Sequence, residues 1–201
     1  MEFVNQFLSV STRAIEKIDR SQFISTIEFL HEIRERKGRL FIAGSGGGAG
    51  HSSHAAADFR RLASIESYAI GDNVSELTAL INDESWENSY AISLSQSKFK
   101  KTDALLVLSV GGGNAEKNVS VNLINAIKFV KEVGGVVIGV ASNSGGFLGE
   151  TADSFISIPV SENTLVTPIC ESLQALVWHL LVSHPKLKVR PTHWENLGGV
   201  S

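Results

Sequence analysis

Two histidines and two carboxylates have the residue types, and part of the spacing, that metal or acid–base chemistry requires. His54 and Asp58 are four residues apart in a segment with a helical pattern, so their side chains lie on one helix face. An imidazole and a carboxylate at this spacing can bind a divalent metal or act as a coupled acid–base pair. Such a pair is more often a simple surface hydrogen bond, so it does not identify a site by itself.

Glu171 and His179 lie far along the chain, in an apolar helix that we predict over 168–184. A buried polar side chain is costly unless it is hydrogen-bonded, so His179 is either a satisfied core histidine or a functional group. Glu171 is at the start of this helix, where a carboxylate favours the helix dipole in any case. Eight residues span about 12 Å of helix, so one ion reaches both side chains only through an irregular helix or a ligand from another subunit.

The glycine-rich segment Gly44–Gly50 (GSGGGAG) precedes His54 and follows a predicted strand. Backbone N–H groups in such a turn can approach an anion at a helix N-terminus, and Ser45 adds a hydroxyl donor. The spacing of Gly44, Gly46 and Ala49 also partly matches a dinucleotide fingerprint, with Asp72 placed as a ribose-binding acid. The turn alone therefore permits a nucleotide site and a sugar-phosphate site.

A second glycine cluster, Ser109–Asn114 (SVGGGN), ends the third predicted strand. It offers a second nest of backbone N–H groups, and two nests on neighbouring strand ends can hold two ends of one ligand. We expect Asn114 to be the N-cap of a helix over 116–132. The alternative interpretation of this cluster is a flexible turn without a ligand.

Apolar strands alternate with amphipathic helices along the whole chain, which indicates a parallel α/β sheet covered on both faces. Ligands of such sheets bind at the carboxyl ends of the strands, where both glycine clusters fall. The predicted strands cover 39–44, 67–71, 103–109, 135–140 and 155–159. The predicted helices cover 2–18, 21–37, 51–63, 73–81, 84–98, 116–132, 146–152 and 168–184.

We interpret residues 1–201 as one domain, because no internal repeat or linker divides the chain. A unit of this size does not need the leading helical pair, within residues 1–37, to close its core. We therefore expect that pair to pack against another subunit. Residues 185–201 form a C-terminal tail that we expect to be extended.

The composition is that of a water-soluble enzyme. The net charge is −3, so nothing attracts nucleic acid or an anionic membrane surface. Cys170 is the only cysteine and cannot form an internal disulfide, which favours the cytoplasm. We find no run of about 18 apolar residues and no signal-peptide pattern, so we expect neither a membrane span nor a leader.

Taken together, these features resemble the SIS (sugar isomerase) domain and, within it, the phosphoheptose isomerase family. The resemblance covers nearly the whole chain: two leading helices, the Gly-Ser-Gly-Gly turn, His-x-x-x-acid, Asn-Asp, the loop opened by a serine, and a C-terminal helix with His179. It implies a five-stranded parallel sheet in a three-layer αβα sandwich. It also implies a zinc ion, a homotetramer, and active sites between subunits, which would explain the leading helices.

The resemblance also assigns roles to residues. Asp58 corresponds to the proposed base and His179 to the proposed acid. The implied zinc ligands are His54, Asp58, Glu171 and His179. The implied substrate-binding residues are Ser45, Gly46, Gly47, Asn82, Asp83, Ser109, Val110, Gly111, Asn114 and Glu171.

Three departures from the family pattern are visible. Asp58 is one methylene shorter than the family's glutamate, and Glu171 replaces a glutamine and so adds a charge. In the second loop Val110, Gly111, Gly112 and Gly113 replace a run of hydroxyl side chains. Phosphate at this loop would rest on backbone N–H groups.

We therefore predict an aldose–ketose isomerase that converts a sugar phosphate, sedoheptulose 7-phosphate, to a heptose 7-phosphate through an enediol. One alternative is a non-catalytic SIS module that senses a sugar phosphate or docks a partner protein. Another is a dinucleotide-dependent oxidoreductase, which leaves Glu171 and His179 without a role.

Overall fold

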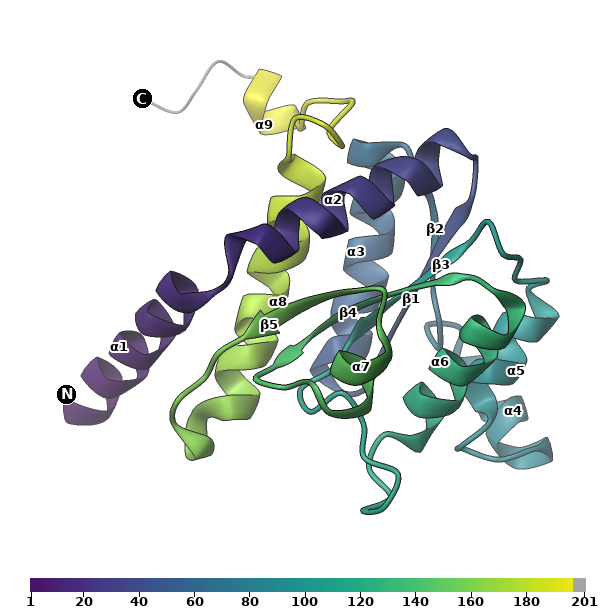
Figure 1. The fold of residues 1–201 in the computed structure, drawn as a ribbon, viewed down its shortest axis with the longest axis horizontal. Coiled ribbons are helices and arrows are strands. Elements are labelled where there is room, and N and C mark those ends of the chain that lie inside the picture. The colour runs from purple at the N-terminus through teal and green to yellow at the C-terminus, as the bar shows by residue number, and fades with distance from the viewer. Residues whose placement is uncertain (197–201) are drawn as a thin grey trace.

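The computed structural model, which describes residues 1–196, has a parallel sheet between two layers of helices (Figure 1). Its strand order is β2-β1-β3-β4-β5, and every neighbouring pair is parallel. This confirms the predicted three-layer fold and its five strands. The strands are β1 (Arg39–Gly44), β2 (Glu66–Ala69), β3 (Ala104–Leu108), β4 (Val136–Ser142) and β5 (Ser154–Ile158).

The strands form because their residues are apolar on both faces. In β1, Leu40 and Ile42 pack into one core cluster, whereas Phe41 and Ala43 pack into a second cluster on the opposite face. The central strand β3 is buried at every position. Such strands need a helix layer on each side to remove both faces from water.

The two helix layers follow from this sheet. The first layer contains α1 (Glu2–Lys17), α2 (Arg20–Glu35), α3 (Gly47–Ala63) and α8 (Val166–Ser183). The second contains α4 (Val74–Asp83), α5 (Ser89–Gln96), α6 (Val121–Val133) and α7 (Gly146–Thr151). A 3-10 turn, η1 (Asn163–Leu165), leads into α8.

The two leading helices differ in their relation to the core. Helix α2 buries Phe23, Ile27, Leu30 and Ile33 against the sheet. The expectation that the core closes without this helix is therefore wrong. Helix α1 buries only Val10 and Ala14 and projects from the body of the domain (Figure 1).

Helix α8 is apolar on average, although polar residues interrupt its sequence and leave no long uninterrupted apolar run. Together with η1, residues Asn163–Ser183 are long enough to span a membrane and include an 18-residue window with a mean hydropathy of 1.5, as such a helix would have. Half of this window is buried inside the domain. Its buried apolar residues, which include Ile169, Val177 and Leu181, belong to the first core cluster, so we assign α8 as a core helix.

Several predicted boundaries are wrong. Helix α3 begins at Gly47 rather than 51, and α5 begins at Ser89 rather than 84. The helix predicted over 116–132 begins only at Val121, because Asn114 and Val119 pair as a short antiparallel bridge before it. The tail contains a short helix, α9 (His193–Asn196), and its backbone is held where Val189 N–H donates to the Leu62 carbonyl. The predicted tail residues 197–201 lie outside the described residues.

Candidate active site

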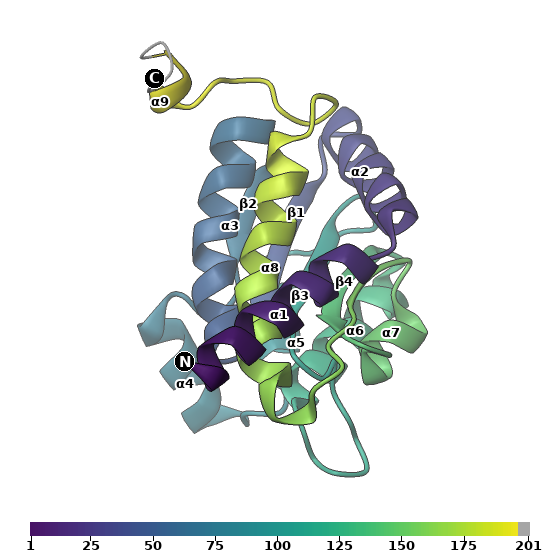
Figure 2. The ribbon, with the colours of Figure 1, turned by 90° about the vertical axis from the view of Figure 1, so that its left-hand side faces the viewer.

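Helices α3 and α8 lie side by side and run in the same direction (Figure 2). Glu171 in α8 contacts Gly47 at the start of α3, and His179 lies against Asp58 further along α3. The two helices therefore meet at two levels that carry polar side chains. The first level is at the glycine turn, and the second is about 12 Å further along α8.

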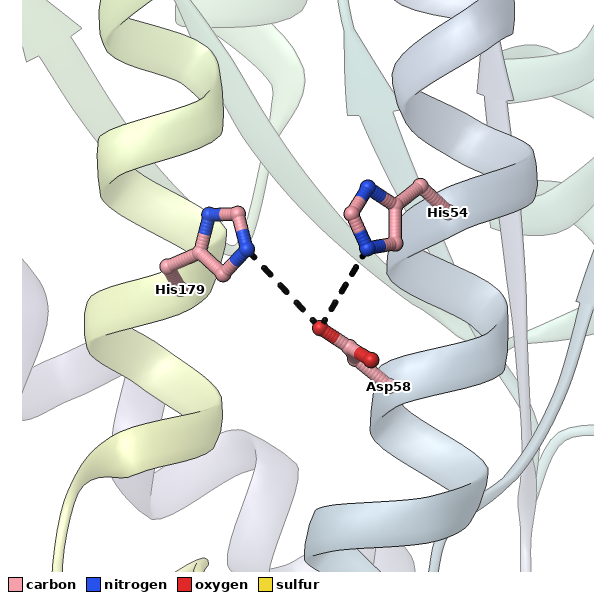
Figure 3. A group of neighbouring side chains, drawn as sticks. All are labelled: His54, Asp58 and His179. Carbon is pink, nitrogen blue, oxygen red and sulfur yellow. Dashed lines mark ion pairs between the residues drawn. The ribbon is translucent and has the colours of Figure 1, made fainter. Parts of the chain in front are cut away.

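His54, Asp58 and His179 form the second level, and their polar ends point toward one another (Figure 3). The Nε2 atoms of His54 and His179 lie 3.8 and 3.9 Å from Oδ2 of Asp58. The histidine side chains are 62% and 50% exposed, and that of Asp58 is 21% exposed. The group therefore opens onto the outer surface of the helix layer, where a ligand can reach it. His179 is not the core histidine that we considered from its apolar neighbours.

The hydrogen bonding of His179 leaves one ring nitrogen available. Nδ1 lies 2.8 Å from the carbonyl of Ala175, one turn earlier in α8. Because a carbonyl only accepts, Nδ1 carries a proton in this contact, and Nε2 is the ring nitrogen that faces Asp58. Trp178 packs edge-on against the His54 ring with 4.6 Å between ring centroids and restricts how that ring turns.

The donor set of this group suits zinc. One ligand atom from each of the three residues lies within 4.8 Å of the others. At zinc–ligand distances of about 2.1 Å, tetrahedral ligands are about 3.4 Å apart, so small side-chain rotations complete the approach. Two imidazoles and one carboxylate are a common zinc set that leaves one position open for water or substrate.

Glu171 lies at the other level. A Cβ built on Gly47 would be 2.6 Å from Oε2 and 2.9 Å from Oε1 of Glu171, so the carboxylate rests directly on that glycine. The described chain thus brings together three of the four predicted metal ligands and leaves Glu171 at the turn. The helix spacing estimated from the sequence accounts for the separation.

Close backbone packing and a buried tyrosine hold the first glycine turn. A Cβ on Gly48 would lie 2.3 Å from the Leu108 carbonyl, so the turn touches the neighbouring strand end. Tyr90 of α5, which we did not predict as a site residue, donates its hydroxyl to the Gly44 carbonyl at 2.8 Å. Burial raises the pKa of Tyr90, and the nearby Ser45 hydroxyl lowers it in part. Tyr90 therefore remains a neutral donor beside the turn.

Ser45 lies within the turn itself. Its hydroxyl oxygen is buried, and no polar atom among the described residues is placed to form a hydrogen bond with it. Gly46, which follows it, has a φ of +58° and is exposed. The predicted substrate-binding residues Ser45, Gly46 and Gly47 are thus contiguous and close to Glu171.

The second loop is built differently. The Ser109 hydroxyl accepts a hydrogen bond from Gly112 N–H at 3.0 Å. The Ser109 carbonyl accepts another from Gln174 of α8, also at 3.0 Å, which ties this loop to the helix that carries Glu171. Val110 is partly buried, and Gly111 is exposed. The two loops therefore flank the first part of α8.

Two other predicted residue sets stand apart. Asn82 and Asp83 end α4, are exposed, and hydrogen-bond to each other at 2.7 Å. Their helix lies at the same end of the molecule as the loop between β3 and α6 (Figure 1), but no hydrogen bond joins them to either glycine loop among residues 1–196. Asn114 accepts from Lys117 N–H at 2.8 Å and caps a turn, so its predicted role as the N-cap of the next helix is wrong.

Comparison with known sequences extends these observations. Residues 2–142 match the family model described as the SIS domain. Over 188 residues the chain is 32% identical to the lincomycin biosynthesis protein LmbN of Streptomyces lincolnensis, covering 90% of this chain and 68% of that protein. Over 149 residues it is 30% identical to a phosphoheptose isomerase of Rhodospirillum rubrum, covering 72% of this chain and 73% of that enzyme.

The fold is also that of a solved structure, the phosphoheptose isomerase of Neisseria gonorrhoeae. The TM-score is 0.78, and the match covers 90% of this chain and 96% of that one. At 22% sequence identity, this likeness concerns the fold.

Proposed function

The chain belongs to the SIS domain family, and on that premise we propose that it is an aldose–ketose isomerase acting on a sugar phosphate. The observation that carries the proposal is the group formed by His54, Asp58 and His179, which offers a base, an acid and metal-ligand atoms at one place. Relatives named as phosphoheptose isomerases support the same reaction class. Sedoheptulose 7-phosphate is the substrate that we propose, with a heptose 7-phosphate as product.

The reaction needs two proton transfers on adjacent carbons. Asp58 takes the proton from the carbon next to the carbonyl, which gives an enediolate, and a proton taken up by the former carbonyl oxygen makes it an enediol. His179 then returns a proton to the former carbonyl carbon, and the hydroxyl oxygen on the first carbon loses its proton to become the new carbonyl. Asp58 is the less exposed of the three side chains, which limits its hydration, and it lies within reach of both imidazoles. Substrate hydroxyls would contact Ser45, Gly46, Gly47, Asn82, Asp83 and Glu171, and the phosphate would bind at Ser109, Val110, Gly111 and Asn114.

A zinc ion would be held by His54, Asp58 and His179. Glu171 would be the fourth ligand only if it came from another subunit or if its helix moved. Bound zinc polarises oxygen atoms of a substrate. The Nε2 atom of His179 cannot bind a metal and carry a proton at once. Metal content and turnover of His179 variants therefore separate its two proposed roles. Protein that contains no zinc, and that zinc neither stabilises nor activates, would remove the metal from the proposal.

Turnover of sedoheptulose 7-phosphate by the zinc-loaded protein tests the reaction. Asp58→Asn and His179→Gln should each lower kcat by about 10²–10⁴-fold, the usual contribution of a general acid or base. His193→Gln, which changes an exposed histidine on α9, is the matched control and should retain activity. Stabilisation by sugar phosphates without turnover would favour the alternative function, a non-catalytic sensor or partner-binding regulator.

We also propose that the protein is a cytoplasmic homotetramer whose active sites lie between subunits. Helix α1 supports this proposal, because it exposes Phe3, Val4 and Leu8 by 63%, 51% and 60%. The outward-facing histidines of the candidate site lie in the same helix layer. Sedimentation of the wild type and of Phe3→Ser/Leu8→Ser measures the assembly, and an unchanged mass would contradict the role of α1.

A further inference from the structure

Glu171 places a negative charge where the first glycine turn would otherwise receive an anion. Its carboxylate rests on Gly47, the first residue of α3, and any side chain at that position would displace it. The first turn of α3 contains no acidic residue of its own. A carboxylate at a helix N-terminus is stabilised by the helix dipole and its free N–H groups. The turn is therefore already supplied with an anion from α8.

The surroundings keep Glu171 in this position. Its neighbour Cys170 is fully buried and contacts the Ser109 carbonyl with Sγ at 3.9 Å, and Gln174 donates to the same carbonyl. One turn of α8 is thus tied to the second loop while Glu171 faces the first. The carboxylate stands between the two glycine loops and is itself partly exposed.

We propose that Glu171 is a specificity-determining residue that excludes phosphate from the turn Gly44–Gly50 and accepts hydrogen bonds from sugar hydroxyls. Two anions at one helix terminus repel each other, whereas a hydroxyl can donate to the carboxylate. The phosphate of the substrate then lies at the second loop, and the substrate has one permitted direction across the site. This inference rests on the proposed function for the nature of the ligand.

The test is the binding of inorganic phosphate, measured by calorimetry on the full chain, so it does not depend on turnover. Glu171→Gln keeps the shape of the side chain and removes its charge, and phosphate affinity should rise at least tenfold. Glu132→Gln, which removes an exposed charge on α6, is the control and should leave the affinity unchanged. The gain should shrink in 1 M salt, where the Debye length falls to about 3 Å.

Zinc affinity of the same variants distinguishes this role from metal ligation. The proposal predicts equal zinc affinity in Glu171→Gln and wild type. Equal phosphate affinity in the two proteins, no phosphate binding in either, or weaker zinc binding in Glu171→Gln would each overturn it. A protein that shows the phosphate effect but no isomerase activity would contradict the proposed function and leave this inference standing.

Discussion

The two glycine loops have nearly the same sequence signal but different structures. Gly44–Gly50 passes directly into α3, and its glycines admit a neighbouring carbonyl at Gly48 and a carboxylate at Gly47. Ser109–Asn114 leads instead into a short bridged segment before α6, and its glycines pack on the turn that begins α7. The first loop is shaped for a helix terminus and the second for contact between two backbones. A run of glycines after a strand therefore predicts that another group packs directly against the backbone. It does not predict whether that group is a carbonyl, a carboxylate or a ligand.

The largest effect is expected at Gly112 in the second loop. A Cβ there would lie 1.6 Å from the Gly145 carbonyl, and the residue has a φ of +71°. Gly112→Ala should lower the free energy of unfolding by about 3 kcal/mol or more, from overpacking and backbone strain together. Urea denaturation measures the loss. Gly111→Ala is the control, because open space surrounds its Cβ position and its φ is not positive; a similar loss there would contradict backbone packing as the cause.

The first turn should respond in two opposite ways. Gly48→Ala would bring a Cβ within 2.3 Å of the Leu108 carbonyl and should destabilise the protein by about 1–3 kcal/mol. Gly50→Ala meets open space within α3 and should stabilise the protein by about 0.5–1 kcal/mol, because alanine favours a helix. Thermal unfolding of both variants tests the difference. If both variants were stabilised or both destabilised, contact with the neighbouring strand would not determine which glycines the turn requires.

Tyr90 should stabilise the first turn and leave the second unaffected. Tyr90→Phe removes the hydrogen bond to the Gly44 carbonyl and should lower the free energy of unfolding by about 1 kcal/mol. Because the ring and its packing remain, the fold persists. Amide hydrogen exchange should rise near Gly44–Gly50 and stay constant near Ser109–Asn114. Faster exchange at both loops would indicate a general loss of stability.

The smallest effect concerns Cys170, which packs under the second loop. Burial raises its pKa to about 12. The thiol of the unfolded chain ionises near pH 8.5, so unfolding is favoured progressively as pH rises above that value. Between pH 8 and 9.5, wild type should lose about 1 kcal/mol more stability than Cys170→Ala, in which this proton is absent. Urea denaturation at each pH measures the free energy of unfolding of both proteins. An equal change with pH in the two proteins would contradict burial of the thiol.

Much of the fold was predictable because it depends on local apolar patterns. The five strands and the major helices follow from runs such as those of β1 and β3, whose residues are buried on both faces. The pairing of His54 with Asp58 follows from helix periodicity alone. The late start of α6 was missed because Asn114 caps a turn rather than the helix, and a capping residue looks the same in either position.

The contacts of the site that join residues far apart in the sequence could not be predicted from local sequence patterns. Tyr90 lies 46 residues from Gly44, and no spacing rule links an apolar helix to a distant carbonyl. The position of Glu171 depends on the register between α3 and α8, which aligns residues 47 and 171 at one level and 58 and 179 at the next. Helix geometry predicted the separation of Glu171 from His179, but it could not say which of the two meets Asp58.

Turnover of sedoheptulose 7-phosphate in D₂O tests the central claim most directly. An isomerase that uses an enediol formed by Asp58 must exchange the removed proton with solvent, so the product should carry deuterium on the carbon beside its carbonyl. Asp58→Asn should abolish both turnover and label. No turnover by zinc-loaded protein, or turnover that transfers hydrogen without any deuterium, would contradict the account.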